Sequence, residues 1–194
     1  MDSLKLEELL GHVVGDPIQK AKMLLGTFGS LRAIEEAELE EISDALLGDR
    51  TTATYIKLAV ALASRRECDK LTLGRKHTDS EIENYFIALF FGISVETVAV
   101  MSIDALGRVV AVDKAGEGTV NFSNVMPRKI LEIAKRRRAK SIVIAHNHPG
   151  GYAIPSDDDI VAAKLIFEML NISGIDVLQN YVVAANKCSK VDVK

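Results

Sequence analysis

Two histidines stand one residue apart in the sequence, and three consecutive aspartates follow a short distance later. His146 and His148 lie at the end of the apolar run "SIVIA", and seven residues separate His148 from Ser156, which begins the segment "SDDD". Side chains at positions i and i+2 of a strand point to the same face, so both imidazoles can reach one ion at about 2 Å from each ring nitrogen. The spacing is therefore suited to half of a metal site.

A third ligand has to come from another part of the chain. Asp159 is well placed if a helix that begins at Ser156 packs against the end of the strand. Two imidazoles, one carboxylate and an open position for water make a catalytic zinc site. Each part also has an ordinary explanation, because a serine N-cap followed by acidic residues is what the helix dipole favours in any protein, and loop histidines can simply be solvated. The combination at this spacing favours the metal site.

The composition limits the classes of protein that such a site could belong to. The 194 residues, 48% of them hydrophobic, can bury a core and form one domain plus a small second one. A formal net charge of -3 argues against a surface built throughout to hold nucleic acid. Cys68 and Cys188 form no CxxC pair, which indicates neither a disulfide framework nor a thiolate zinc site and is typical of a reducing cytosol.

The N-terminus is acidic where a signal peptide needs basic residues, and no apolar run approaches the roughly 18 residues of a membrane span. We therefore expect a cytoplasmic protein without membrane contact.

The pattern of apolar residues changes near residue 70. The residues before it look wholly helical, with a helix start at Asp16-Pro17 and a further helix after Gly48. Between them, the segment 27–43 contains a glycine-marked break and then a second, acidic helical stretch. The segment 67–77 has mixed charge and little periodicity, which is typical of a boundary. The sequence predicts a small helical domain at 1–70 and a second domain at 74–194.

The second domain mixes helices with strands. A helix with Ser80 and Glu83 at capping-box spacing is expected first, and two β-branched runs joined by "ALG" predict a hairpin. The remaining expected elements are a helix over 126–139, a buried strand over 140–145, a helix from Ser156 to about Leu170 and a last strand over 177–185. This order predicts an α/β domain with a mixed β-sheet flanked by helices.

The pattern H-N-H-P followed by S-x-x-D resembles the signature of the JAMM metalloproteases, which is carried by MPN-type domains. More narrowly, the chain resembles the bacterial RadC-like proteins, which typically read "AHNHPSG" where this chain reads "AHNHPGG". The segments "SVETVAVMSIDALGRVV" and "MPRKILEIAKRRRAKSIVIAHNHP" resemble RadC-like segments in the same order. The resemblance implies an MPN (JAMM) domain preceded by a small all-α domain like a helix-hairpin-helix. The contiguous letters HNH are no evidence for an HNH nuclease, whose three named residues lie far apart in sequence.

The resemblance also implies a glutamate that takes a proton from the zinc-bound water. Glu96 holds the matching place, fifty residues before His146, while Asp113 and Glu117 are rivals by composition. The implied activity is cleavage of an amide, in a peptide or isopeptide substrate, by water whose pKa zinc lowers from about 15.7 towards roughly 7.

In that chemistry Glu96 passes the proton to the leaving amine, and the hydroxyl of Ser156 hydrogen-bonds the developing oxyanion. If Ser156 also caps the helix, the two roles compete for one side chain.

The sequence also departs from the RadC-like pattern, which keeps a second interpretation open. The family usually has a Gly-x-Gly hairpin whose amides hold a DNA phosphate, whereas this chain has only Gly48 there, and it has Gln179-Asn180 where the family often has Asp-His. The basic run "KRRRAK" at 135–140 is either a solvated helix end or a patch for nucleic acid or an acidic partner. The alternative is a DNA-repair-associated, DNA-binding accessory protein with a structural or inactive metal site. The complete ligand set favours the hydrolase, and the missing glycines predict a weak DNA contact.

Overall fold

The computed structural model describes residues 2–12, 14–118, 126–184 and 186–192. The chain divides into two compact units, Met1–Ser64 and Arg65–Lys194, each with its own hydrophobic core. Within the described ranges no helix combines the length and the apolar character that crossing a membrane requires.

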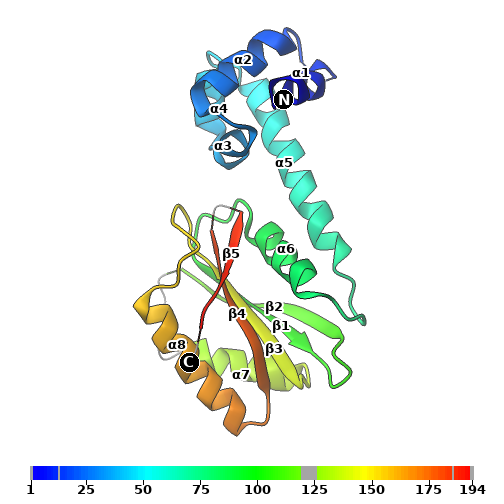
Figure 1. The fold of residues 1–194 in the computed structure, drawn as a ribbon, viewed down its shortest axis with the longest axis vertical. Coiled ribbons are helices and arrows are strands. Elements are labelled where there is room, and N and C mark those ends of the chain that lie inside the picture. The colour runs from blue at the N-terminus through cyan, green and yellow to red at the C-terminus, as the bar shows by residue number, and fades with distance from the viewer. Residues whose placement is uncertain (1, 13, 119–125, 185, 193–194) are drawn as a thin grey trace. The chain divides into compact units, whose positions relative to one another are not determined.

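The first unit is helical (Figure 1). Its helices are α1 (Asp2–Gly11), α2 (Pro17–Phe28), α3 (Leu31–Glu36), α4 (Leu39–Ala45) and most of α5 (Arg50–Lys70). Asp16-Pro17 starts α2 as predicted, with the proline in the first turn, although the Asp16 side chain makes no capping hydrogen bond. The acidic stretch predicted as one helix is two, because Ala37 is extended and Glu38 starts α4 with its own capping box.

In the turn between α4 and α5, a carboxylate side chain lies at the start of α5. The backbone of the turn is left-handed at Leu47 and at Gly48. The carboxylate of Asp49 then accepts the backbone N–H of Thr52 at 3.0 Å and the ammonium of Lys20 at 2.6 Å. The hydrogen bond from Lys20 holds the pKa of Asp49 well below its usual range. The positive end of α5 is thus already paired with a negative charge of the chain itself.

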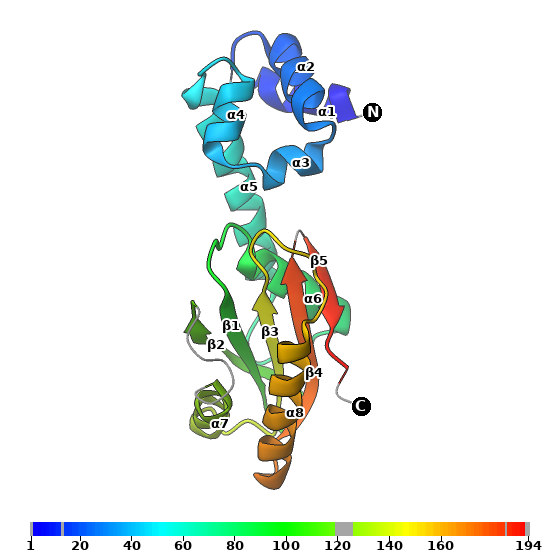
Figure 2. The same ribbon diagram turned by 90° about the vertical axis from the view of Figure 1, so that its left-hand side faces the viewer.

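The second unit is a five-stranded mixed sheet with helices on both faces, which confirms the predicted α/β class. The strands are β1 (Thr97–Ile103), β2 (Val109–Glu117), β3 (Ser141–Asn147), β4 (Asp176–Ala184) and β5 (Lys187–Lys190), in the order β2-β1-β3-β4-β5. Only β3 and β4 run parallel. Helix α6 (Asp79–Phe90) covers one face, and α7 (Met126–Arg136) and α8 (Asp157–Ile172) cover the other (Figure 2).

The central strands are apolar because both of their faces are covered. Every residue of β1 and β3 is buried. Their side chains alternate between the two cores: Val98, Val100, Ile142 and Ile144 pack with α7 and α8, whereas Ala99, Met101, Val143 and Ala145 pack with α6. A strand between two covered faces reads as a continuous apolar run, as "SIVIA" does.

One expectation for this unit was wrong in detail. The capping box of α6 is formed by Thr78 and Glu81, not by Ser80 and Glu83. The spacing S/T-x-x-E occurs twice in this segment, two residues apart, and the sequence alone does not distinguish the two. The strand predicted over 177–185 is β4, which begins at Asp176 and ends at Ala184, while residue 185 lies outside the described residues. The edge strand β5 follows it and escaped prediction because "KCSK" has no apolar alternation.

Candidate metal centre

The two histidines lie at the carboxyl end of the central strand β3. His146 is in the strand and is buried, and His148 follows it, with its backbone N–H donated to the carbonyl of Val183 on β4 at 2.9 Å. Strand-like geometry therefore continues through His148, and the two rings share one face of the sheet. Their Nε2 atoms are 3.2 Å apart.

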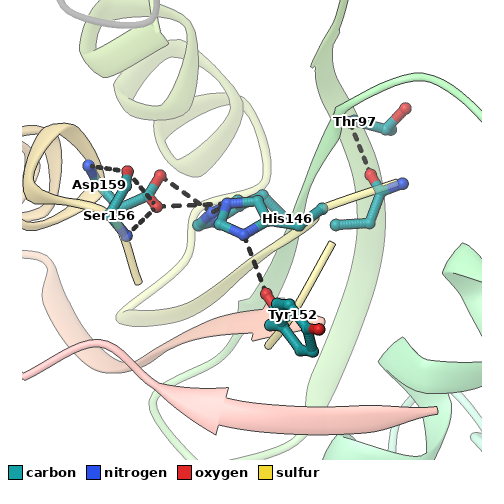
Figure 3. A network of polar contacts seen from close by, with 7 residues as sticks. Thr97, His146, Tyr152, Ser156 and Asp159 are labelled. Atoms are coloured by element: carbon teal, nitrogen blue, oxygen red, sulfur yellow. Dashed lines mark hydrogen bonds and ion pairs between the residues drawn. The ribbon is translucent and has the colours of Figure 1, made fainter. Parts of the chain in front are cut away.

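Asp159 reaches the same point from the first turn of α8. Its Oδ1 is 3.0 Å from Nε2 of His146, and its Oδ2 is 3.3 Å from Nε2 of His148 (Figure 3). The helix starts where the sequence predicted, because Ser156 is the N-cap and Asp159 occupies the third helical position. An acidic side chain at that position points back towards the helix start, which here is the end of β3.

Glu96 joins this group from the residue before β1. Val98 lies directly opposite His146 in the antiparallel ladder, and Glu96 is two residues earlier than Val98, so its side chain leaves the same face of the sheet. Ligand atoms of Glu96, His146, His148 and Asp159 all lie within 4.8 Å of one another. Residues fifty positions apart in sequence thus meet because β1 and β3 are neighbours.

The distances among three of these residues suit a small ion with four ligands. In a tetrahedral zinc site with bonds of about 2.0–2.1 Å, neighbouring ligand atoms are about 3.3 Å apart. The Nε2 atoms of His146 and His148 are 3.2 Å apart, and each lies close to one oxygen of the Asp159 carboxylate, at 3.0 Å from Oδ1 for His146 and at 3.3 Å from Oδ2 for His148. Two imidazole nitrogens and one carboxylate are also a donor set that zinc accepts. The residues present therefore fit a metal of this kind.

A backbone carbonyl orients one of the rings. Nδ1 of His148 is 3.2 Å from the carbonyl oxygen of Tyr152 in the loop between β3 and α8 (Figure 3). A carbonyl oxygen only accepts, so Nδ1 carries the hydrogen and Nε2 keeps its lone pair for a metal. The loop turns closely around this histidine, because a Cβ on Gly151 would lie 3.4 Å from the Cβ of His148.

The charge state of Asp159 also suits a ligand. Burial by itself raises the pKa of this carboxyl, but in the absence of a metal, hydrogen bonds from His146 and Ser156 outweigh it and hold the pKa well below its ordinary value. The carboxylate is therefore ionised at neutral pH, which is the form that binds a metal.

Ser156 contacts the carboxylate of Asp159. Its Oγ donates to Oδ2 of Asp159 at 2.6 Å and accepts the backbone N–H of the same residue at 3.2 Å. The side chain thus caps α8 and orients Asp159. Its single hydrogen points to the carboxylate, so the expected role as an oxyanion donor stays a prediction.

The rivals of Glu96 lie outside this group of described residues. Asp113 on β2 accepts from Arg136 at 3.2 Å and from Arg137 at 2.7 Å, and these hydrogen bonds, above all that from Arg137, lower its pKa against the opposing effect of burial. Glu117 is exposed and pairs with Lys114. Two residues of the basic run at 135–140, Arg136 and Arg137, therefore join the end of α7 to β2.

Two participants were not found by sequence reasoning. The carbonyl of Tyr152 has no signal in the sequence, since every residue has one. Asn147 lies between the two histidines, and its side chain accepts the N–H of Thr97, the residue after Glu96. Sequence reasoning did not connect Asn147 with the site, because its side chain points to the opposite face of the strand from the histidines.

Fold and site together define a JAB-type α/β domain with a group of residues that can hold a metal ion. The family model described as "RadC-like JAB domain" matches residues 77–192. The chain is 32% identical over 170 residues to a UPF0758 protein of Chromobacterium violaceum, covering 86% of this chain and 75% of that protein. It is 29% identical over 188 residues to a UPF0758 protein of Desulforudis audaxviator, covering 95% and 80%. The chain belongs to the RadC-like JAB domain family, which confirms the resemblance seen in its sequence.

Proposed function

We propose that this protein is a zinc-dependent hydrolase that cleaves an amide bond in a peptide or isopeptide. The observation that carries the proposal is the group of Glu96, His146, His148 and Asp159, whose ligand atoms lie within 4.8 Å of one another. The two imidazoles and the aspartate are the proposed ligands, which leaves the glutamate beside them for proton transfer. Membership of a JAB domain family supports the same activity.

A zinc ion held by these ligands would supply Lewis acidity, both to acidify a water molecule and to polarise the carbonyl of the bond to be cleaved. Glu96 is the proposed proton acceptor. Its carboxylate takes one proton from the water as the water oxygen bonds to the amide carbon, and gives it to the nitrogen as the C–N bond breaks. Ser156 is the proposed donor to the oxyanion, which requires its hydrogen to turn away from Asp159.

The metal is tested first, on protein purified without a tag and without added metal. Elemental analysis should find about one zinc per chain in the wild type and little in His148→Ala, because two remaining ligands hold the ion poorly. His12→Ala, a change at an exposed histidine of the first unit, is the matched control and should keep the zinc. Wild-type protein without metal, or His148→Ala with a full complement of zinc, would contradict the proposed site.

Hydrolysis is tested separately, with a defined mixture of synthetic peptides that includes an isopeptide-linked one. Mass spectrometry should find cleavage products that disappear with a chelator and return with zinc. If zinc is bound at the proposed site but no product forms, the alternative of an accessory protein with a structural metal is favoured.

We propose that any contact with DNA is weak. Asp49 supports this, because its carboxylate stands at the start of α5, where a DNA phosphate would otherwise be held. The pairing of Arg136 and Arg137 with Asp113 also supports it, since it partly neutralises the basic run. Fluorescence anisotropy with a labelled duplex should give a Kd no tighter than about 10⁻⁶ M at physiological salt. Much tighter binding that weakens steeply with salt would contradict the proposal.

A further inference from the structure

Asn147 is the residue between the two proposed histidine ligands, but its side chain points in a different direction from theirs. It is the last residue of β3 and is only 4% exposed. Because side chains alternate along a strand, that of Asn147 leaves the face of the sheet opposite to His146 and His148. It therefore does not belong to the ligand set.

The side-chain amide of Asn147 makes three hydrogen bonds to one short stretch of backbone. Its Oδ1 accepts the N–H of Thr97 at 2.7 Å, and its Nδ2 donates to the carbonyls of Ile93 at 3.1 Å and Val95 at 3.2 Å. Figure 3 shows the bond to Thr97 beside the metal centre. One acceptor and two donors are what an amide offers and what no hydroxyl or carboxylate of similar size can supply.

These bonds lie on both sides of Glu96 in the chain. The backbone ladder between β1 and β3 ends with the pair Val98 and His146, so Glu96 lies beyond its last rung. Beyond this pair, the side chain of Asn147 continues to join the end of β3 to the segment before β1. On the side of β2, the carbonyl of Glu96 accepts the N–H of Gly118 at 2.8 Å. The backbone at Glu96 is thus held from both neighbouring strands.

We propose that Asn147 is a positioning residue that fixes the carboxylate of Glu96 beside the metal ligands. The inference rests on the proposed function, in which Glu96 moves the proton. A general base has to be within hydrogen-bond reach of the proton that it takes, and a misplacement of about 1 Å can cost about 100-fold in rate. The residue between the two proposed histidine ligands therefore also sets the place of the base, which directly precedes the neighbouring strand β1.

The test compares Asn147→Ala, and the milder Asn147→Ser in case the alanine variant fails to fold, with Asn180→Ala. Asn180 is also a buried asparagine of the central sheet, but its Oδ1 has no hydrogen-bond partner among the described residues. It therefore controls for the loss of a buried amide. Zinc affinity, measured by competition with a chelator, should stay within about threefold of the wild type in all three variants, because none of them removes a ligand.

Two readouts report on Glu96 itself. Hydrogen exchange at the amide of Thr97 should become about tenfold faster in the Asn147 variants and stay unchanged in Asn180→Ala, because that N–H loses its acceptor. Crystal structures of the zinc-loaded variants should keep His146, His148 and Asp159 in place and find the Glu96 carboxylate displaced. Both measurements can also be made on metal-free protein.

On a peptide cleaved by the wild type, a double-mutant cycle with Glu96→Gln separates positioning from mere stability. Asn147→Ala should lower kcat by about tenfold or more in the wild type and have no further effect in Glu96→Gln, because its influence acts through the carboxylate. Additive losses would overturn the inference. So would a crystal structure of Asn147→Ala in which Glu96 has not moved. If the wild type binds zinc and only these results fail, the proposed function stands without this inference; if the wild type binds no zinc, both are overturned.

Discussion

Ser156 Oγ lies 2.6 Å from Oδ2 of Asp159, so the residue that starts α8 also holds the carboxylate of a proposed metal ligand. The capping box is an ordinary device for satisfying the first N–H groups of a helix. Here its acidic member is turned towards two histidines at the end of strand β3. Helix capping and ligand orientation are therefore served by one pair of side chains.

Changing Ser156 to Ala should affect stability and metal binding together. Loss of the cap should lower the free energy of unfolding by about 1 kcal/mol. Loss of the hydrogen bond to Asp159 should weaken zinc binding by about 10-fold to 100-fold, as is typical when an outer partner of a metal ligand is removed. Thermal unfolding and chelator competition measure the two effects. Ser30→Ala is the control, because Ser30 caps α3 through the N–H of Ala33 and lies in the first unit. Ser30→Ala should lower the free energy of unfolding without weakening zinc binding. An equal loss of zinc affinity in Ser156→Ala and Ser30→Ala would contradict the prediction.

Changing Glu96 to Gln should separate catalysis from metal binding. The amide keeps the shape of the side chain but is not a base, so turnover of a cleaved peptide should fall by about 100-fold or more while the zinc content persists. The control is Glu117→Gln, because Glu117 is exposed and pairs with Lys114. Steady-state kinetics and elemental analysis of the same samples are the measurements. Full activity in Glu96→Gln would assign the proton transfer to another residue.

Asp113 should make stability depend on pH in a defined direction. Its pKa is lowered by the hydrogen bond from Arg137, so the folded state favours the ionised carboxylate more than the unfolded chain does. The extra stability is present above the unfolded pKa of about 3.9 and is lost as pH falls through the lower folded pKa. At neutral pH, Asp113→Asn should cost on the order of 1 kcal/mol, because the arginines are largely exposed.

Urea unfolding of metal-free protein at pH values from about 7 down to 3 measures this dependence. The difference in the free energy of unfolding between wild type and Asp113→Asn should become smaller as the pH falls. Asp176→Asn removes the exposed pair with Lys140 and should change little at neutral pH. A difference for Asp113→Asn that grows as the pH falls would contradict the assigned sign.

Asp49 should be a stabilising residue of the first unit. Asp49→Ala removes the cap of α5 and the partner of Lys20, and should lower the free energy of unfolding by about 1–2 kcal/mol. Asp44→Ala, at an exposed position of α4, should change it by less than about 0.5 kcal/mol. Chemical denaturation of the full chain, followed by a probe placed in the first unit, compares the two variants. Equal stability would mean that Asp49 is not needed as a cap.

The sequence by itself determined most of the elements and the chemistry of the proposed metal ligands. Apolar alternation, turn residues and helix caps act over a few residues, so the hairpin, the apolar strand of His146 and the helix that starts at Ser156 could all be predicted. His146, His148 and Asp159 lie within one strand–loop–helix segment, and local geometry therefore brings them together. Where local rules apply equally to two neighbouring positions, as at Thr78 and Ser80, the prediction failed.

Only the tertiary structure decided what depends on the pairing of distant strands. Glu96 faces the histidines because Val98 is opposite His146, and a shift of one residue in that register would turn it to the other face. The same pairing brings Asn147 to the backbone around Glu96, whereas Asp113 on β2 pairs with Arg136 and Arg137 at the end of α7. The resemblance to RadC-like proteins favoured Glu96, but Asp113 and Glu117 were its rivals by composition, because carboxylates are chemically alike until the register of the sheet gives each one its neighbours.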